Sequence, residues 1–136
     1  MDNQGLLEAA RSIRHYLPDL VGPAAADQLD RQVAELLATA GRGENTTAAL
    51  RSLLNSNSVT KAFVAKVLAD APHYRPHDLQ PDYLRTHGMQ PLPGAVGPVL
   101  HAGKYSCPHG DYVWYRSAVG VPVKGCPTHH CPLTRI

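Results

Sequence analysis

Cysteine is confined to one short segment of this chain, and that restriction limits the possible folds more than any other feature. All three cysteines lie between Cys107 and Cys131, and His109, His129 and His130 fall within the same 25 residues. Cysteines in a reducing compartment favour a metal site or free thiols over disulfides. Thiols and imidazoles at this density therefore indicate a C-terminal region that binds a metal ion.

Two turns in this region have the spacing of metal-binding knuckles. Residues 126–129 read Cys-Pro-Thr-His, which puts two ligands three residues apart on a tight turn, where both face one ion. Residues 107–110 read Cys-Pro-His-Gly and form a matching half with shorter spacing. The two halves together offer enough donors for one ion.

The residues between the knuckles predict a β-hairpin. Asp111–Arg116 is strongly β-prone, Val121–Val123 is a second and shorter β-prone run, and Ser117 and Gly120 mark the turn between them. Pairing of these two strands would bring both knuckles to the same end of the hairpin. Four ligands could then surround one ion.

Zinc is the expected metal, because thiolate and imidazole ligands in a closed tetrahedral arrangement suit Zn(II). A β-unit of this size buries too little surface to fold alone, so the expected role of the ion is structural. The expected ligands are Cys107, His109, Cys126 and His129, with Cys131 as the alternative to His109 and His130 as a weaker alternative.

The segment from Tyr105 to Leu133 resembles the zinc-ribbon superfamily, and more narrowly the small ribbons of bacterial multidomain signalling and conflict proteins. The likeness lies in Cys-Pro-x-Gly-Asp-Tyr-x-Trp-Tyr-Arg and in Val-Pro-x-x-Cys-Pro-Thr-His, and it covers 29 of the 136 residues. Cys107, Cys126 and His129 are the positions that fit the ribbon pattern. The first knuckle departs from the usual Cys-x-x-Cys, which leaves the fourth ligand open.

The first half of the chain, residues 1–70, predicts a bundle of four short helices, because apolar residues recur there at helical spacing. Gly22-Pro23 ends the first helix, Gly41–Gly43 the second, and the polar run 55–58 the third. Asn45 or Thr46 is expected to cap the third helix and Ser58 the fourth. The expected inward residues are Leu6, Ala10, Ile13 and Leu17, then Leu29, Val33, Leu36 and Leu37, then Leu50, Leu53 and Leu54, and finally Val59, Phe63, Val64, Val67 and Leu68. This half is similar to the helical effector-associated adaptor domains of the same bacterial systems, which implies protein–protein association without catalysis.

The middle of the chain, residues 71–103, is expected to be an irregular strap. Six prolines fall between Pro72 and Pro98, a density that forbids long helices and central strands. A short helix could start at Pro81 and carry Tyr83 and Leu84. The remainder is expected to lie extended across the bundle. The whole is thus expected to be an α+β chain, with the bundle at 1–70, the strap at 71–103 and the zinc ribbon at 104–136.

Charge and motifs exclude several functions. The net charge of +2 is too mild to indicate nucleic acid by itself, and Lys104, Arg116, Lys124 and Arg135 would support only weak, salt-sensitive binding. No run of 18 apolar residues predicts a membrane span, and the first residues lack the pattern of a secretory signal, so we expect a cytoplasmic location.

Catalysis is not expected either. The chain has no glycine-rich phosphate loop and no hydrolase or zinc-protease motif, and Asp111 is the only acidic residue near the knuckles. Trp114 is expected to be the only large core residue of the ribbon and to pack on the helical half, although an aromatic face with Tyr112 beside Arg116 could instead stack a base or a peptide proline. The isolated histidines are expected to be surface or packing residues: His15, His73, His77, His87 and His101.

The function predicted from these features is a non-catalytic, zinc-stabilised adaptor or accessory subunit that binds another protein. The alternative is a zinc-ribbon protein that binds nucleic acid. Self-association through an exposed leucine face on a short helix is a further possibility that the sequence leaves open.

Overall fold

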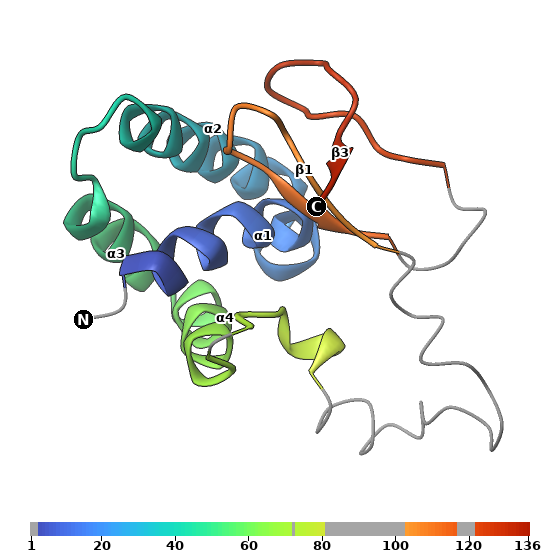
Figure 1. Ribbon diagram of the computed structural model, residues 1–136. Coiled ribbons are helices and arrows are strands. Elements are labelled where there is room, and N and C mark those ends of the chain that lie inside the picture. Colours follow the sequence, from blue (N-terminus) through green and yellow to red (C-terminus); the bar gives the residue numbers. More distant parts are fainter. Residues whose placement is uncertain (1–2, 72, 81–102, 117–121) are drawn as a thin grey trace, which may run out of the picture.

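The computed structural model describes residues 3–71, 73–80, 103–116 and 122–136. Within these residues the chain forms four α-helices followed by a small antiparallel sheet, which confirms the mixed α+β class (Figure 1). The helical elements are α1 Asn3–Val21, α2 Pro23–Gly41, α3 Thr47–Asn55, α4 Ser58–Ala69 and the short 3-10 helix η1 His77–Leu79. The strands are β1 Lys104–Ser106, β2 Val113–Tyr115 and β3 Thr134–Arg135.

Helix α1 forms the centre of the bundle and packs against α2, α3 and α4. Its predicted apolar stripe is confirmed, because Leu6, Ala10, Ile13 and Leu17 are all fully buried. Pro18 lies within the last turn without ending the helix. The end comes at Gly22, as predicted, where the backbone takes a φ of +90° that favours glycine.

The remaining helices bury most of the residues expected to face inward. Val33 and Leu37 of α2, Leu50 and Leu54 of α3, and Phe63, Val64 and Val67 of α4 join the same core. Leu29, Leu36, Leu53 and Leu68 are partly buried against it. Among the helices that the structure describes, none has the length and apolar character needed to cross a membrane.

Two details at the start of α4 correct the sequence prediction. The cap is Asn57 rather than Ser58, since the Asn57 side chain accepts a hydrogen bond of 2.8 Å from the Val59 backbone N–H. Val59 was expected to face inward but is 42% exposed. The physical reason is that Thr60, one position later, occupies the inward place and donates its buried hydroxyl to the Leu54 carbonyl.

The sheet has the strand order β2-β1-β3, and both strand pairs are antiparallel. The predicted pairing of 111–116 with 121–123 is therefore wrong: β2 pairs with β1, with Tyr105 opposite Trp114. Pro122 and Val123 lie outside the strands and are exposed, and proline has no N–H to donate to a neighbouring strand. The predicted turn residues Ser117 and Gly120 fall outside the described residues.

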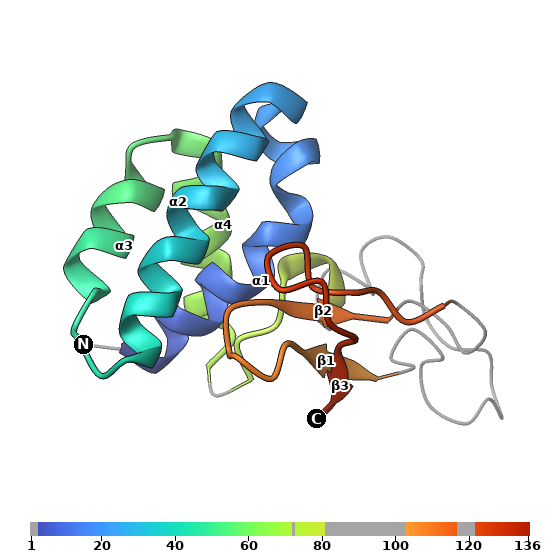
Figure 2. The ribbon, with the colours of Figure 1, turned by 90° about the horizontal axis from the view of Figure 1, so that it is seen from above.

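A second, smaller apolar cluster lies within the C-terminal unit, which comprises the described residues 103–116 and 122–136. Trp114 is only 7% exposed and packs against Tyr105, with ring centroids 5.9 Å apart, which confirms its predicted burial. It is not the only large core residue, because Tyr105 and Tyr112 are buried in the same cluster. The members of this cluster are Tyr105, Cys107, Tyr112, Trp114, Cys126 and Leu133, with Cys131 at its edge. Strand β2 lies against α1, which places the unit beside the helices (Figure 2).

The first part of the strap is docked on the bundle, as expected. The Tyr16 hydroxyl of α1 donates to Asp78 Oδ1 at 3.0 Å, and the Gln80 side-chain amide donates to the Lys66 carbonyl at 2.8 Å. Residues 81–102, with the short helix expected at Pro81, lie outside the described residues.

Candidate metal centre

The first knuckle is the turn that joins β1 to β2. The Cys107 N–H donates to the Tyr112 carbonyl at 2.9 Å, and the Gly110 N–H donates to the Cys107 carbonyl at 2.8 Å. Gly110 makes this closure possible with a φ of +77°. The turn thus holds the Cys107 and Asp111 side chains on the same side of the hairpin end.

The second knuckle closes on itself in a similar way. The His130 N–H donates to the Cys126 carbonyl at 2.8 Å, and the Cys126 N–H donates to the Cys131 carbonyl at 2.9 Å. The backbone N–H of His129 also points to Cys126 Sγ at 3.5 Å. An N–H directed at a sulfur is typical of a thiolate ligand, because it stabilises negative charge there.

The two knuckles face each other, and five predicted donors lie close together. Cys107 Sγ lies 3.5 Å from His109 Nδ1, 3.5 Å from His129 Nδ1 and 3.8 Å from Cys131 Sγ. Cys126 Sγ lies 3.7 Å from His129 Nδ1. His130, the weaker alternative, belongs to neither group of neighbouring donors that the described residues form.

These donors divide into two groups that share Cys107. In the first group, the donor atoms of Cys107, Asp111, Cys126 and His129 all lie within 4.8 Å of one another. In the second, the same holds for Cys107, His109 and Cys131. From the sequence, Asp111 is only an acidic residue near the knuckles and is not among the expected ligands.

The cluster is largely enclosed. Cys107, Cys126 and Asp111 are buried, while the His129 side chain is 30% exposed. Burial raises the pKa of the Cys107 thiol, and the neighbouring Cys126 and Asp111 side chains raise it further, against an opposing effect of the His109 backbone N–H. A cation between the sulfurs would reverse this preference, because metal coordination deprotonates a thiol.

Arg14 of α1 connects the two knuckles to the helices. Its guanidinium forms a two-point ion pair with Asp30 of α2, with N–O distances of 2.5 and 3.0 Å. It also donates to the Asp111 carbonyl of the first knuckle at 2.6 Å and to Thr128 Oγ1 of the second at 2.5 Å. Arg14 itself is 4% exposed, so a single buried cation joins two helices and both knuckles.

These contacts keep the Arg14 guanidinium protonated and positively charged. Burial lowers the pKa of a guanidinium, but the hydrogen bond and charge of Asp30, with the charge of Asp111, offset this and raise the pKa overall. The guanidinium carbon also lies 5.3 Å from the centre of the Tyr112 ring. Two further contacts reinforce this junction: Lys104 Nζ with Glu8 at 2.9 Å, and Arg11 Nε with the Gly110 carbonyl at 2.7 Å.

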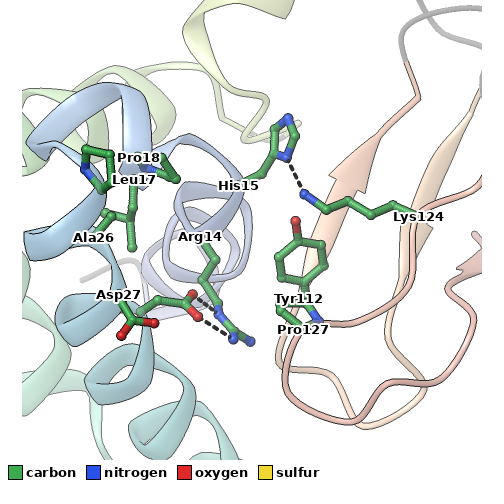
Figure 3. A pocket seen from close by; sticks show the side chains of 11 residues that line it. Arg14, His15, Leu17, Pro18, Ala26, Asp27, Tyr112, Lys124 and Pro127 are labelled. Atoms are coloured by element: carbon green, nitrogen blue, oxygen red, sulfur yellow. Dashed lines mark hydrogen bonds and ion pairs between the residues drawn. The ribbon is translucent and has the colours of Figure 1, made fainter.

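A groove of about 310 Å³ runs along this junction between the helices and the second knuckle (Figure 3). Leu17 and Pro18 line it on one side, and Tyr112 and Lys124 on the other. Lys124 Nζ lies 3.2 Å from Nδ1 of His15. Burial and then the charge of Lys124 lower the pKa of His15, so the imidazole is neutral at pH 7 and accepts a hydrogen bond from the ammonium.

The other histidines behave as predicted where the structure describes them. His15, His73 and His77 belong to neither donor group. His15 packs edge-on against Tyr16, and His77 packs edge-on against Phe63. His87 and His101 lie outside the described residues.

Comparison with known proteins identifies no relative of this chain. No protein-family model matches it, and neither a curated protein nor a solved structure does. The resemblance of residues 105–133 to zinc ribbons therefore depends on the two knuckles and the segment between them. The donor cluster and its contacts with the helices are therefore the features that bear on function.

Replacing Arg14 should separate the C-terminal unit from the helices. Arg14→Met leaves the partly buried Asp30 and the buried Asp111 without their cation, and breaking a buried pair in this way costs about 3–5 kcal/mol. The loss is measured by urea denaturation, with Trp114, the single tryptophan of the chain, as fluorescent reporter of the C-terminal unit.

Arg31→Met is the matched control. Arg31 pairs with Asp27 within α2, but their side chains are 75% and 70% exposed, so the expected cost is below about 1 kcal/mol. Equal stability losses in the two variants would contradict the role given to Arg14.

Proposed function

We propose that this protein is a non-catalytic adaptor whose C-terminal unit is held in shape by one structural zinc ion. Cys107, Cys126 and His129 are three of the ligands, and a fourth side chain completes the set. The observation that carries the proposal is the convergence of thiol and imidazole donors from two separate knuckles on one point.

The distances between donors suit one tetrahedral ion. With Zn–S of about 2.3 Å and Zn–N of about 2.0–2.1 Å, two sulfurs on the same ion lie about 3.8 Å apart, and a sulfur and a nitrogen about 3.6 Å apart. His129 Nδ1 lies 3.5 Å from Cys107 Sγ and 3.7 Å from Cys126 Sγ. These two separations suit one tetrahedral zinc ion, and the two sulfurs lie within 4.8 Å of each other.

A structural role is favoured because the unit has little else to stabilise it. Its described strands are two or three residues long, and its apolar cluster includes two of the proposed thiolate ligands themselves. A unit of this size buries little apolar surface, and small domains of this kind usually need a metal ion or disulfides for stability. Structural zinc sites supply folding free energy directly, and that free energy is about 10–16 kcal/mol in zinc-finger peptides.

The adaptor function is supported by the contacts that connect the buried donor cluster to the helices. Cys107, Cys126 and Asp111 are buried, and Arg14 joins their knuckles to α1 and α2. The metal-bound unit and the bundle therefore form a continuous surface with a fixed relative orientation. A rigid, composite surface of this kind suits recognition of a protein partner, because little conformational entropy is lost on binding.

Binding of nucleic acid is the second candidate, and the basic residues of the C-terminal unit support it less well. Lys104 is paired with Glu8 at 2.9 Å, and Lys124 donates to His15. A lysine or arginine contributes to the affinity for nucleic acid only when its side chain can contact a phosphate. Two of the four cations expected to contact phosphate are thus engaged within the protein.

The metal site is tested by comparing two adjacent histidines. His129→Asn removes an expected ligand, whereas His130→Asn changes an exposed residue of the same turn, and asparagine tolerates the φ of +55° at that position. We expect His129→Asn to shift Trp114 fluorescence toward that of the unfolded chain and to abolish the effect of EDTA. His130→Asn should match the wild type in both respects.

A wild-type fluorescence spectrum that EDTA leaves unchanged would contradict a structural metal. The same conclusion would follow if both asparagine variants behaved alike.

The adaptor function is tested by affinity capture from the native host with nuclease and salt as variables. We expect a protein partner to be retained by the wild-type and His130→Asn chains after nuclease treatment and to be lost with His129→Asn. Retention that depends on nucleic acid and falls steeply as salt rises from about 50 to 200 mM would favour the alternative function. Retention of the same proteins by all three chains would contradict the proposed link between metal and partner.

A further inference from the structure

We propose that Asp111 is the fourth ligand of the metal, so that two thiolates, one imidazole and one carboxylate hold the ion: Cys107, Cys126, His129 and Asp111. This inference rests on the proposed metal site and deepens it. It replaces His109 and Cys131, the two fourth ligands that the sequence favoured, with a residue that no motif indicated.

The distances between the donor atoms favour Asp111 as the fourth ligand. Asp111 is the only carboxylate in the described donor groups, and its group alone holds four donors that all lie within 4.8 Å of one another. Asp111 Oδ2 lies 3.2 Å from His129 Nδ1, close to the separation of about 3.3 Å expected for oxygen and nitrogen on one tetrahedral zinc. Its other oxygen, Oδ1, lies 3.7 Å from Cys126 Sγ.

One buried oxygen of Asp111, Oδ2, has no hydrogen-bond partner among the described residues. Asp111 is 1% exposed, and its Oδ2 accepts no hydrogen bond from any residue that the structure describes. Arg14 Nη1, 3.9 Å away, offsets part of the negative charge but donates no hydrogen bond to this oxygen, and a bound metal ion would supply the missing partner.

The position of His129 explains why this oxygen has no partner. Nδ1 of His129 is the ring nitrogen that faces Cys107 Sγ, Cys126 Sγ and Asp111 Oδ2. If Nδ1 carries a metal, it has no proton to donate to the carboxylate. Both atoms would then direct a lone pair at the same cation, which agrees with a separation of 3.2 Å at which Oδ2 has no hydrogen-bond partner among the described residues.

His109 and Cys131 have other roles in the same region. The His109 ring stacks on the His129 ring, with centroids 3.8 Å apart and an interplanar angle of 13°, so it restrains the orientation of a ligand. Cys131 closes the second knuckle through its backbone carbonyl. Cys131 Sγ lies 3.8 Å and His109 Nδ1 3.5 Å from Cys107 Sγ, separations that also suit one zinc ion, but neither side chain belongs to the group that contains Cys126 and His129.

Arg14 acts on this site as a positioning residue. It donates to the Asp111 backbone carbonyl at 2.6 Å, and its Nη1 lies 3.9 Å from Asp111 Oδ2. The guanidinium therefore fixes Asp111 and links its carboxylate to α1. Asp111 is therefore connected both to the proposed metal, through its carboxylate, and to the helical bundle, through Arg14.

Cobalt(II) is the probe for this assignment, because its sulfur-to-metal charge-transfer band grows with the number of thiolate ligands. The full chain is titrated with cobalt(II) under reducing conditions. We expect a two-thiolate spectrum for the wild type, and the same spectrum for Cys131→Ser and for His109→Phe, which keeps an aromatic ring to stack on His129 but removes the imidazole nitrogens. Asp111→Cys should add a third thiolate and raise the band about 1.5-fold, and Asp111→Asn should weaken cobalt binding by at least about tenfold.

Each outcome has a definite meaning. A band that falls by about a third in Cys131→Ser would make Cys131 the fourth ligand and overturn the proposal. A changed tetrahedral spectrum in His109→Phe, or an unchanged band in a folded Asp111→Cys, would also overturn it. If Asp111→Cys does not fold, Cys131→Ser and His109→Phe still decide the question. Failure of the wild type to bind cobalt or zinc at all would instead reject the proposed metal site.

Discussion

The convergence of two knuckles on one point is the constraint on which the C-terminal unit depends. Each knuckle is a tight turn closed by its own backbone hydrogen bonds, and together they place Cys107, Cys126 and His129 within reach of one ion. Without an interaction at that point, the unit would rely on short strands and one small apolar cluster. In this account, the metal supplies the free energy that the limited buried surface cannot.

The buried guanidinium of Arg14 extends that constraint to the rest of the molecule. Several polar and ionic contacts join the helices to the C-terminal unit: Arg14 with Asp111 and Thr128, Lys104 with Glu8, and Arg11 with Gly110. Such contacts depend on precise geometry, because hydrogen bonds weaken steeply with misalignment. The shape of the knuckles thus determines whether α1 can hold the unit in place, which would give the proposed structural metal an influence well beyond its ligands.

The helices could be predicted because their signals are local. The stripe from Leu6 to Leu17 and the glycine at the end of α1 follow from spacing and backbone preference alone. The cap of α4 was misplaced by one residue, since both Asn57 and Ser58 have suitable side chains and only the structure shows which one accepts the hydrogen bond.

The strand pairing and the role of Arg14 depend on contacts between distant residues, which periodicity does not encode. β1 is only three residues long, too short for a recognisable strand pattern, so the partner of β2 was assigned to 121–123 instead. A signal for Arg14 was nevertheless present, since it lies four residues after Ala10 and next to Ile13, on the buried face of α1. A charged residue in that position indicates a buried ionic contact.

The most direct test of the account is the mass of the intact chain under native conditions, after purification under reducing conditions without added metal. The account predicts a chain that carries one zinc ion and that loses it, together with the native Trp114 fluorescence, when a chelator is added. A chain that is free of metal and still shows the folded C-terminal unit, with Cys107 and Cys126 held as ordinary thiols, would contradict it.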